Sequence, residues 1–373
     1  MHIAWLGKKS PFCGNVTYSR EITNALLSRG YKVSFFHFSQ DNDEDILETY
    51  NAEVSLPFLY KSQIYTIPAP KSSQILLRSL QELKPDLVHA SLTLSPIDFK
   101  LPEICQQLKI PLVATFHPPF DSHWRNIKSS TQYLTYQLYA PSLARYDKTI
   151  IFSELQRDML IKLGVPAKKL AIIPNGVDTL KYQPAKSYFK QQFPHHQLFI
   201  YQGRIAVEKN VESLFKAWKF SGIATNAKLL IVGDGHLTPS LRANYNEEDG
   251  IIWLGAIVDE AKRIDILRSA DVFILPSLVE GLSLSLLEAM ACGLACVATD
   301  AGADGEVLAN AGIVLSTRGV TSQLKTVLPL FQHHPELNQL LGAKARQRVL
   351  DKYTLSDNVT KLEQLYHEII RSC

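Results

Sequence analysis

The chain has 373 residues, of which 46% are apolar, so it is long enough for two domains with proper cores. Its formal net charge of +3 gives no strong attraction to nucleic acid. Five scattered cysteines, an odd number, favour reduced thiols over a disulfide framework. No apolar run reaches the ~18 residues of a membrane span, and the first residues do not resemble a signal peptide, so we expect a cytoplasmic protein.

The chain opens with a βαβ pattern. We predict a strand over 2–6, a loop over 7–14, a helix over 15–29 and a second strand over 31–38. The loop does not spell G-x-G-x-x-G, so the pattern predicts no dinucleotide cofactor. Gly14 either makes a tight turn or lies against a ligand. Four further strands are expected in this half, over 86–89, 111–116, 149–152 and 171–174.

His117 comes directly after one of these strands. Ligands of open α/β sheets bind beyond the carboxyl ends of strands, where a histidine can hydrogen-bond a sugar hydroxyl. A structural role for the ring is the alternative. No set of metal ligands surrounds His117 in the sequence.

Residues 122–148 mix aromatic and basic side chains. Such a mixture suits a membrane interface, where rings lie at headgroup depth and cations meet anionic lipid. The alternative is an amphipathic helix that covers the sheet, because three of the tyrosines recur at every third position. The residues concerned are Trp124, Arg125, Lys128, Tyr133, Tyr136, Tyr139, Arg145, Tyr146 and Lys148.

A polar, proline-containing stretch over 178–197 is expected to link the two domains. A helix is expected before it, over 154–163, and an amphipathic helix ends the chain, over 353–370. The pattern as a whole predicts an α/β protein with two doubly wound, Rossmann-like parallel-sheet domains that face a cleft. Strands of the second domain are expected over 198–202, 228–232, 251–254, 272–275, 294–298 and 312–315.

Residues 271–306 carry the densest set of candidate site residues. After the strand over 272–275, a helix is expected to start at Ser283 and to end at Gly293. Glu280 lies in the loop before the helix and Glu288 lies within it, while the amides of Gly281, Leu282 and Ser283 form a candidate anion site. Two carboxylates with an anion site between them suit a nucleotide sugar; solvated surface carboxylates are the alternative.

Four motifs in this chain resemble those of the retaining glycosyltransferases of family 4. Glu280 and Glu288 reproduce the family's E-x7-E signature. The segment Q-G-R at 202–204 with E-K-N at 208–210 resembles its diphosphate-binding segment. I-V-G-D-G at 231–235 resembles its V-G-x-G turn, and P-N-G-V-D at 174–178 resembles its hinge entry. The resemblance covers nearly the whole chain and implies the GT-B fold. The domains implied are an acceptor-binding domain over 1–177, a nucleotide-sugar-binding domain over 178–352 and a C-terminal helix over 353–373 that crosses back to the first.

The resemblance also implies roles for individual residues. Arg204 and Lys209 would stabilise the diphosphate leaving group, Glu280 would contact the sugar and Glu288 would bind the ribose hydroxyls. His117 would lie beside the transferred sugar. No metal is implied, because D-x-D spellings occur only in the acidic segment 41–45, outside the donor motifs. Backbone contact with the nucleotide sugar would come from Gly14, Gly203, Gly233, Gly235, Gly281, Leu282 and Ser283.

The opening over 3–30 resembles the cyanobacterial digalactosyldiacylglycerol synthases of this family. It implies UDP-galactose as donor, monogalactosyldiacylglycerol as acceptor and peripheral association with a membrane. A soluble or polysaccharide acceptor is the alternative within the class. A nucleotide-sugar epimerase and a catalytically silent nucleotide-binding protein are the alternatives from other classes.

Overall fold

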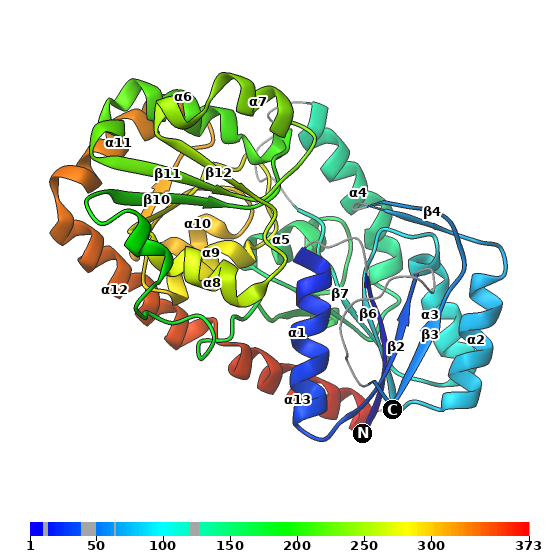
Figure 1. Cartoon of the computed structure of the whole chain (residues 1–373). Coiled ribbons are helices and arrows are strands. Elements are labelled where there is room, and N and C mark those ends of the chain that lie inside the picture. Colours follow the sequence, from blue (N-terminus) through cyan, green and yellow to red (C-terminus); the bar gives the residue numbers. More distant parts are fainter. Residues whose placement is uncertain (10–13, 39–49, 63–64, 120–126, 373) are drawn as a thin grey trace. The chain divides into compact units, whose positions relative to one another are not determined.

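The computed structural model describes residues 1–9, 14–38, 50–62, 65–119 and 127–372. These residues form two compact units. Of the described residues, the first unit contains those of 1–118 and 127–175 and the final helix from Leu355, and the second contains Pro119 and Gly176–Thr354. Each unit is built on one parallel sheet with helices on both of its faces (Figure 1).

The sheet of the first unit has seven strands in the order β3-β2-β1-β6-β7-β8-β9. All of its strand pairs are parallel. The central strands are buried runs of apolar residues, as expected for parallel strands covered on both faces. The strands are β1 (His2–Leu6), β2 (Lys32–His37), β3 (Ala52–Ser55), β6 (Leu87–Ser91), β7 (Leu112–Thr115), β8 (Lys148–Ile151) and β9 (Leu170–Ile172).

Helices α1 (Gly14–Ser28) and α13 (Leu355–Ser372) cover one face of this sheet, and α2 (Ser72–Leu83) and α3 (Ile97–Leu108) cover the other (Figure 1). Two further helices, α4 (Ile127–Leu143) and α5 (Glu154–Lys162), complete the unit. Although α13 follows the second unit in sequence, its apolar side packs into the core of the first. Its buried residues there are Val359, Leu362, Leu365, Tyr366 and Ile369.

A buried hydrogen-bond network joins α13 to the centre of this sheet. The His89 ring is fully buried and stacks on Trp5, with ring centroids 4.0 Å apart. One ring nitrogen, Nδ1, pairs with the Tyr366 hydroxyl, and the other, Nε2, lies 2.8 Å from Thr115 Oγ1. Thr115 Oγ1 is also 3.0 Å from the Tyr18 hydroxyl. Burial lowers the pKa of His89, so the ring is neutral and can accept one hydrogen bond and donate the other.

Replacing Tyr366 with phenylalanine should destabilise the first unit by about 1–3 kcal/mol, because it leaves a buried nitrogen of His89 without a partner. Hydrogen exchange of peptides from β6 and α13 at increasing urea would measure the loss within this unit. Tyr60→Phe is the matched control, because Tyr60 lies in the same unit and is half exposed. Equal protection in the two variants would contradict the prediction.

The sheet of the second unit has six parallel strands in the order β12-β11-β10-β13-β14-β15. From β10 the chain first builds outward on one side, through β11 and β12, and then returns to build the other side with β13, β14 and β15. The point where the series changes direction lies between β10 and β13. The strands are β10 (Gln197–Gln202), β11 (Ala227–Val232), β12 (Ile251–Gly255), β13 (Val272–Leu275), β14 (Ala295–Thr299) and β15 (Ile313–Leu315).

Helices cover both faces of the second sheet, with α6 and α11 on one side and α8, α9 and α12 on the other (Figure 1). Helix α9 begins as predicted, because the Ser283 hydroxyl accepts a hydrogen bond from the amide of Leu286 at 3.3 Å. The helices are α6 (Val211–Ser221), α7 (Thr238–Asn244), α8 (Glu260–Ser269), α9 (Leu284–Ala291), α10 (Asp304–Leu308), α11 (Val320–His333) and α12 (Pro335–Lys352).

The predicted fold of two parallel-sheet, Rossmann-like units is confirmed. Three features were not predicted. The polar stretch interpreted as a linker, 178–197, belongs to the second unit, where the Asp265 carboxylate accepts hydrogen bonds from the amides of Tyr188 and Phe189. Strand β3 was not expected, nor was the antiparallel hairpin of β4 (Phe58–Lys61) and β5 (Thr66–Pro68).

Candidate active site

The candidate donor residues lie at the carboxyl ends of β10 and β13, the two strands beside the change in direction of the second sheet. Open α/β sheets bind ligands at this position. Arg204 and Lys209 follow β10, and Glu280 follows β13. Lys209 and Glu280, which lie 71 residues apart in the sequence, are therefore neighbours, because β10 and β13 pair in the sheet.

Glu280 is paired with Lys209. One carboxylate oxygen of Glu280, Oε1, accepts hydrogen bonds from Lys209 Nζ and, at 2.8 Å, from the Ser277 hydroxyl. Glu280 is only 8% exposed, so the ion pair is largely shielded from water. In a shielded position each charge needs its partner, and loss of one leaves the other poorly solvated. Ser277 was not among the predicted site residues.

Arg204 is paired with a carboxylate of its own loop. Its guanidinium donates to Glu208, and its carbonyl oxygen accepts a hydrogen bond from the Tyr201 hydroxyl at 2.8 Å. Two further bonds tie this loop to the one after β13: the amide of Leu278 donates to Glu208 O at 2.8 Å, and Asn210 Nδ2 donates to Pro276 O at 3.1 Å. The two loops thus form one connected structure around the cations.

Glu288 lies on α9 and faces the end of β10. Its Oε2 accepts a hydrogen bond from Gln202 Nε2 at 2.7 Å, and the side chain is only 8% exposed. Its charge also acts on Tyr182 and Arg263: burial, followed by Glu288, raises the pKa of Tyr182. Gln202 belongs to the Q-G-R motif, but its contact with Glu288 was not predicted.

The start of α9 is already occupied in part by the protein itself. The amide of Ser283, predicted to bind an anion, donates to Asp304 Oδ1 at 2.9 Å. The carbonyl of Gly281 accepts the amide of Ala303 at 2.8 Å. Asp304 was not among the predicted site residues. Its contact with the start of α9 joins residues that are 21 positions apart in the sequence and is recognised only in the structure.

Gly233 and Gly235 allow two loops to pack backbone against backbone. A Cβ atom at Gly233 would lie 1.9 Å from Gly203 O, and one at Gly235 would lie 2.2 Å from Ile205 O. Ile205 N donates to Asp234 O at 3.0 Å, which holds the loops together. The close packing of the loop that carries Arg204 therefore explains why both positions need a residue without a side chain. Their predicted approach to a nucleotide stays a prediction.

Gly233→Ala should destabilise the second unit, because the residue has φ of +129° and its Cβ would overlap Gly203 O. We expect a loss of at least about 1–3 kcal/mol from the backbone conformation alone. Gly319→Ala is the matched control, because Gly319 also has positive φ (+66°) but open space around its Cβ position. Thermal unfolding of the two variants would test this, and equal melting temperatures would argue against the packing explanation.

In the first unit, His117 follows β7 and joins a short polar chain at the carboxyl ends of the strands. Its Nε2 lies 2.9 Å from Ser91 Oγ, which donates to Asn15 Oδ1 at 2.6 Å. Asn15 Nδ2 in turn donates to Leu92 O at 3.2 Å. Because the Ser91 proton is used on Asn15, His117 Nε2 is the donor to Ser91, which leaves Nδ1 as the acceptor nitrogen. Burial and the nearby Lys8 lower the pKa of His117 to about 3, so the ring is neutral.

Gly14 is the first residue of α1 and lies next to Asn15 in this chain of contacts. Ser91, Asn15 and Tyr18, whose ring meets that of His117 edge-on at 4.8 Å, were not predicted as site residues. Sequence spacing gives no signal for them, because they come from α1 and β6, which are far from His117 in sequence.

The interpretation of residues 122–148 as an aromatic membrane face is wrong for the tyrosines that the structure resolves as buried. Their hydroxyls bond inside the first unit: Tyr136 to Pro118 O at 2.9 Å, Tyr139 to Asp98 Oδ2 at 2.8 Å and Tyr146 to Asp98 O at 2.7 Å. The alternative, a helix that covers the sheet, fits them. Trp124 and Arg125 lie outside the described residues.

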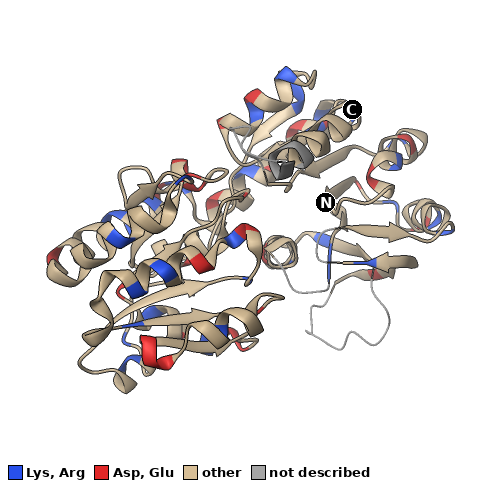
Figure 2. Ribbon diagram, turned by 90° about the horizontal axis from the view of Figure 1, so that it is seen from above, with Lys and Arg blue, Asp and Glu red and all other residues tan. Residues whose placement is uncertain are grey.

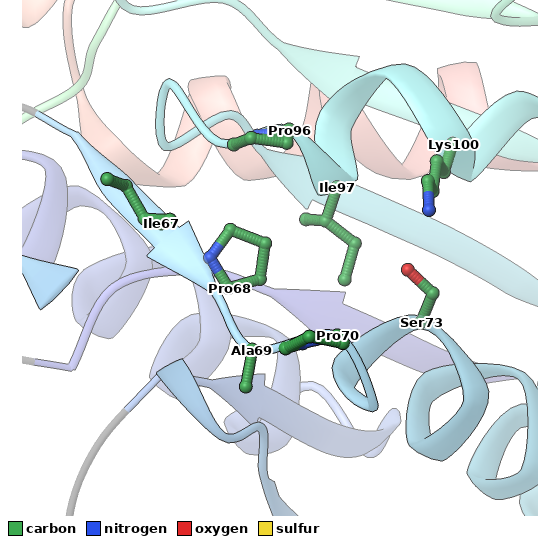
Figure 3. Close-up of a pocket in the computed structure, with 8 residues that line it drawn as sticks. All are labelled: Ile67, Pro68, Ala69, Pro70, Ser73, Pro96, Ile97 and Lys100. Carbon is green, nitrogen blue, oxygen red and sulfur yellow. The ribbon is translucent and has the colours of Figure 1, made fainter. Parts of the chain in front are cut away.

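Within the described part of the chain, no helix is long and apolar enough to cross a bilayer. The same residues contain no group of three or more His, Cys, Asp or Glu side chains that could hold a metal ion. A hollow of about 200 Å³ in the first unit is lined mainly by Ile67, Pro68, Pro70 and Ile97 (Figure 3). None of the predicted site residues lines it, and it is too small for a nucleotide sugar.

Comparison with known proteins agrees with this architecture in both halves of the chain. Residues 13–181 match the family model described as "Glycosyltransferase Family 4", and residues 196–332 match the one described as "Glycosyl transferases group 1". These matches place the chain among the glycosyltransferases, and its two parallel-sheet units have the GT-B architecture. More narrowly, residues 13–181 match the model of family 4, the family that the motifs at 174–288 resemble.

Two curated relatives illustrate the range of similar proteins. A UDP-Gal:alpha-D-GlcNAc-diphosphoundecaprenol alpha-1,3-galactosyltransferase from Escherichia coli is 27% identical over 60% of this chain and 58% of its own length. The sulfoquinovosyl transferase SQD2 from Arabidopsis thaliana is 25% identical over 89% of this chain and 69% of its own length. The match thus spans little more than half of the first relative.

Solved structures show the same fold along the full chain. Sucrose-phosphate synthase from Thermosynechococcus elongatus has a TM-score of 0.79 at 20% identity and covers 100% of both chains. HepE from Anabaena, in complex with UDP-glucose, has a TM-score of 0.79 at 17% identity and also covers 100% of both chains.

Proposed function

We propose that the protein is a retaining, metal-independent hexosyltransferase that takes a hexose from a nucleotide sugar. The observation that carries this proposal is the pair of cations, Arg204 and Lys209, beside two largely buried carboxylates, Glu280 and Glu288, at the ligand-binding edge of the second sheet. A nucleotide sugar carries a diphosphate between two sugars. Its negative charges would face the two cations, and its hydroxyls would donate hydrogen bonds to the two carboxylates.

The chemistry follows from the charge that the reaction creates. Cleavage of the bond between the sugar and the diphosphate leaves negative charge on a phosphate oxygen. Lys209 Nζ and the Arg204 guanidinium are held close to where that charge would develop, and both would stabilise it. In the structure each cation contacts a carboxylate, so donor binding must draw it wholly or partly from Glu280 or Glu208.

Retention at the anomeric carbon is part of the proposal. We favour a transfer in which acceptor and leaving group share one face of the sugar, and the leaving phosphate takes the acceptor proton. Glu280 is already engaged by Lys209 and Ser277, which suits a carboxylate that binds sugar hydroxyls better than a free nucleophile.

For the donor and acceptor we propose UDP-galactose and a membrane glycolipid such as monogalactosyldiacylglycerol. The galactosyltransferase relative from Escherichia coli, whose name contains both UDP-Gal and a lipid-linked diphosphate, supports this pairing. So do apolar side chains exposed on the first unit, Leu134 and Leu138 on α4 and Tyr60 and Ile67 on the β4–β5 hairpin, because such side chains can enter a bilayer interface. Figure 2 shows Lys and Arg interspersed with Asp and Glu over the helices.

A transfer assay on the purified protein tests this proposal. Labelled UDP-galactose and UDP-glucose would each be offered with monogalactosyldiacylglycerol in micelles and with water alone. We expect a digalactosyl lipid that forms only from UDP-galactose. Hydrolysis of a donor without lipid transfer would retain the glycosyltransferase and reject the lipid acceptor. Conversion of one donor sugar into the other would instead identify an epimerase.

A further inference from the structure

Asp304 is a buried carboxyl group that the proposed chemistry does not use. It is the first residue of α10 and is only 1% exposed. Its Oδ1 accepts the amide hydrogen of Ser283 at 2.9 Å, and its Oδ2 is buried without a hydrogen-bond partner. Burying an acid with one unpaired oxygen costs free energy, so the presence of this group calls for an explanation.

The segment before Asp304 follows the backbone of the Glu280 loop. Gly302 has φ of +58°, and a Cβ atom there would lie 2.2 Å from Glu280 O. One residue further on, Ala303 N donates to Gly281 O at 2.8 Å. The contact of Asp304 with Ser283 is therefore the last of three that run along residues 280–283.

We propose that Asp304 is a positioning residue of the donor site: it fixes the 280–283 loop, and through it the Glu280 carboxylate and its partner Lys209. This inference rests on the proposed function for its effect on catalysis. In the proposed reaction, Asp304 touches no reacting atom. Its contribution is to keep Glu280 and the first turn of α9 in place while Lys209 shifts toward the diphosphate.

The protonation state of Asp304 supports this role. Burial, followed by the charge of Glu280, raises the pKa of Asp304 well above its ordinary value, while Ser283 N and Lys209 oppose that rise. The neutral acid therefore persists to a higher pH than an ordinary aspartic acid. The neighbouring charged residues of its segment, Asp300 and Glu306, are also acids and provide no cation that would stabilise an ionised Asp304. If Asp304 ionised, it would compete with Glu280 for Lys209 and would repel the diphosphate.

The test compares Asp304→Asn with Asp304→Ala. Asparagine keeps an oxygen for the Ser283 amide and copies the neutral acid, whereas alanine removes the acceptor. Asp300→Asn is the control, because it changes an exposed carboxylate of the same segment. Three quantities would be measured for each protein: hydrogen exchange of the peptide 280–286 without donor, the dissociation constant of UDP, and kcat and KM for the donor between pH 6 and 10.

We expect Asp304→Ala to speed exchange in the peptide 280–286 and to lower kcat/KM about tenfold or more, because small displacements of binding groups are expensive in catalysis. Asp304→Asn and Asp300→Asn should match the wild type near neutral pH. As the pH rises through the titration of Asp304, the donor KM of the wild type should rise, whereas that of Asp304→Asn should not.

Unchanged exchange in Asp304→Ala would overturn the positioning role, as would an Asp304→Asn variant with the same alkaline rise in KM as the wild type. Failure of the proposed function would look different. In that case the wild type itself would transfer no sugar, while the exchange measurement, which needs no donor, would still decide whether Asp304 holds the loop.

Discussion

Lys209→Ala should lower kcat for sugar transfer about 10²- to 10³-fold, the effect of removing one preorganised charge from a transition state that develops negative charge. Lys209 is the cation held against Glu280, in a position only 19% exposed at its side chain. Water cannot easily replace it there. Arg204→Ala should act in the same direction, and the double variant should lose less than the product of the two effects, because both cations serve one diphosphate.

Lys216→Ala provides the control for this experiment. Lys216 is an exposed lysine on α6, seven residues further along, and it forms an ion pair with Glu212 at 2.9 Å on the same helix. Single-turnover kinetics would separate the chemical step from product release. If Lys209→Ala, folded as judged by circular dichroism, kept the wild-type rate, the diphosphate assignment would be rejected.

Glu288→Ala should weaken UDP binding about 10- to 100-fold, because a hydrogen bond to a charged, shielded group contributes roughly 1.5–3 kcal/mol. The Glu288 side chain is already oriented before a nucleotide binds, because Gln202 donates a hydrogen bond to one of its oxygens at the end of β10. The proposed ligands are the two ribose hydroxyls. A nucleotide without them should therefore bind the wild type weakly.

Calorimetric titration with UDP and with 2′,3′-dideoxy-UDP makes this prediction specific. The wild type should prefer UDP, and Glu288→Ala should bind both nucleotides with similar weak affinity. Glu247→Ala is a suitable control, since Glu247 lies in the same unit away from β10 and β13. A Glu288→Ala variant that still discriminated between the two nucleotides would falsify the ribose assignment.

Local sequence signals were sufficient for the elements that carry the donor residues. The run Val272–Leu275 is a strand, Ser283 caps α9 and Gly293 follows its end with φ of +77°, all as predicted. Each of these signals depends on a residue and its near neighbours in sequence. Short elements with mixed composition escaped the same approach, as the β4–β5 hairpin shows.

Partners within the site could not be predicted, because they are separated by long stretches of chain. Nothing in the sequence pairs Lys209 with Glu280, Gln202 with Glu288 or Asp304 with Ser283. The pairing of β10 with β13 brings the first two pairs together, and the packing of two loops brings the third. The tyrosines of α4 failed for a related reason: a ring with a hydroxyl suits a membrane interface or a core with a buried acceptor, and only Asp98 and Pro118 decide which.

The position of α13 in the first unit has a consequence for how the protein is made. During synthesis, residues 1–175 emerge long before the helix that completes their core, and Gly176–Thr354 must be added in between. The apolar surface that Val359, Leu362 and Tyr366 cover, and the ring nitrogen of His89 that Tyr366 satisfies, stay open throughout this interval. The main part of the second unit, Gly176–Thr354, is continuous in sequence and can fold first. The first unit therefore reaches its native state only after the ribosome has delivered α13 (Leu355–Ser372), which lies near the opposite end of the sequence from β1 (His2–Leu6).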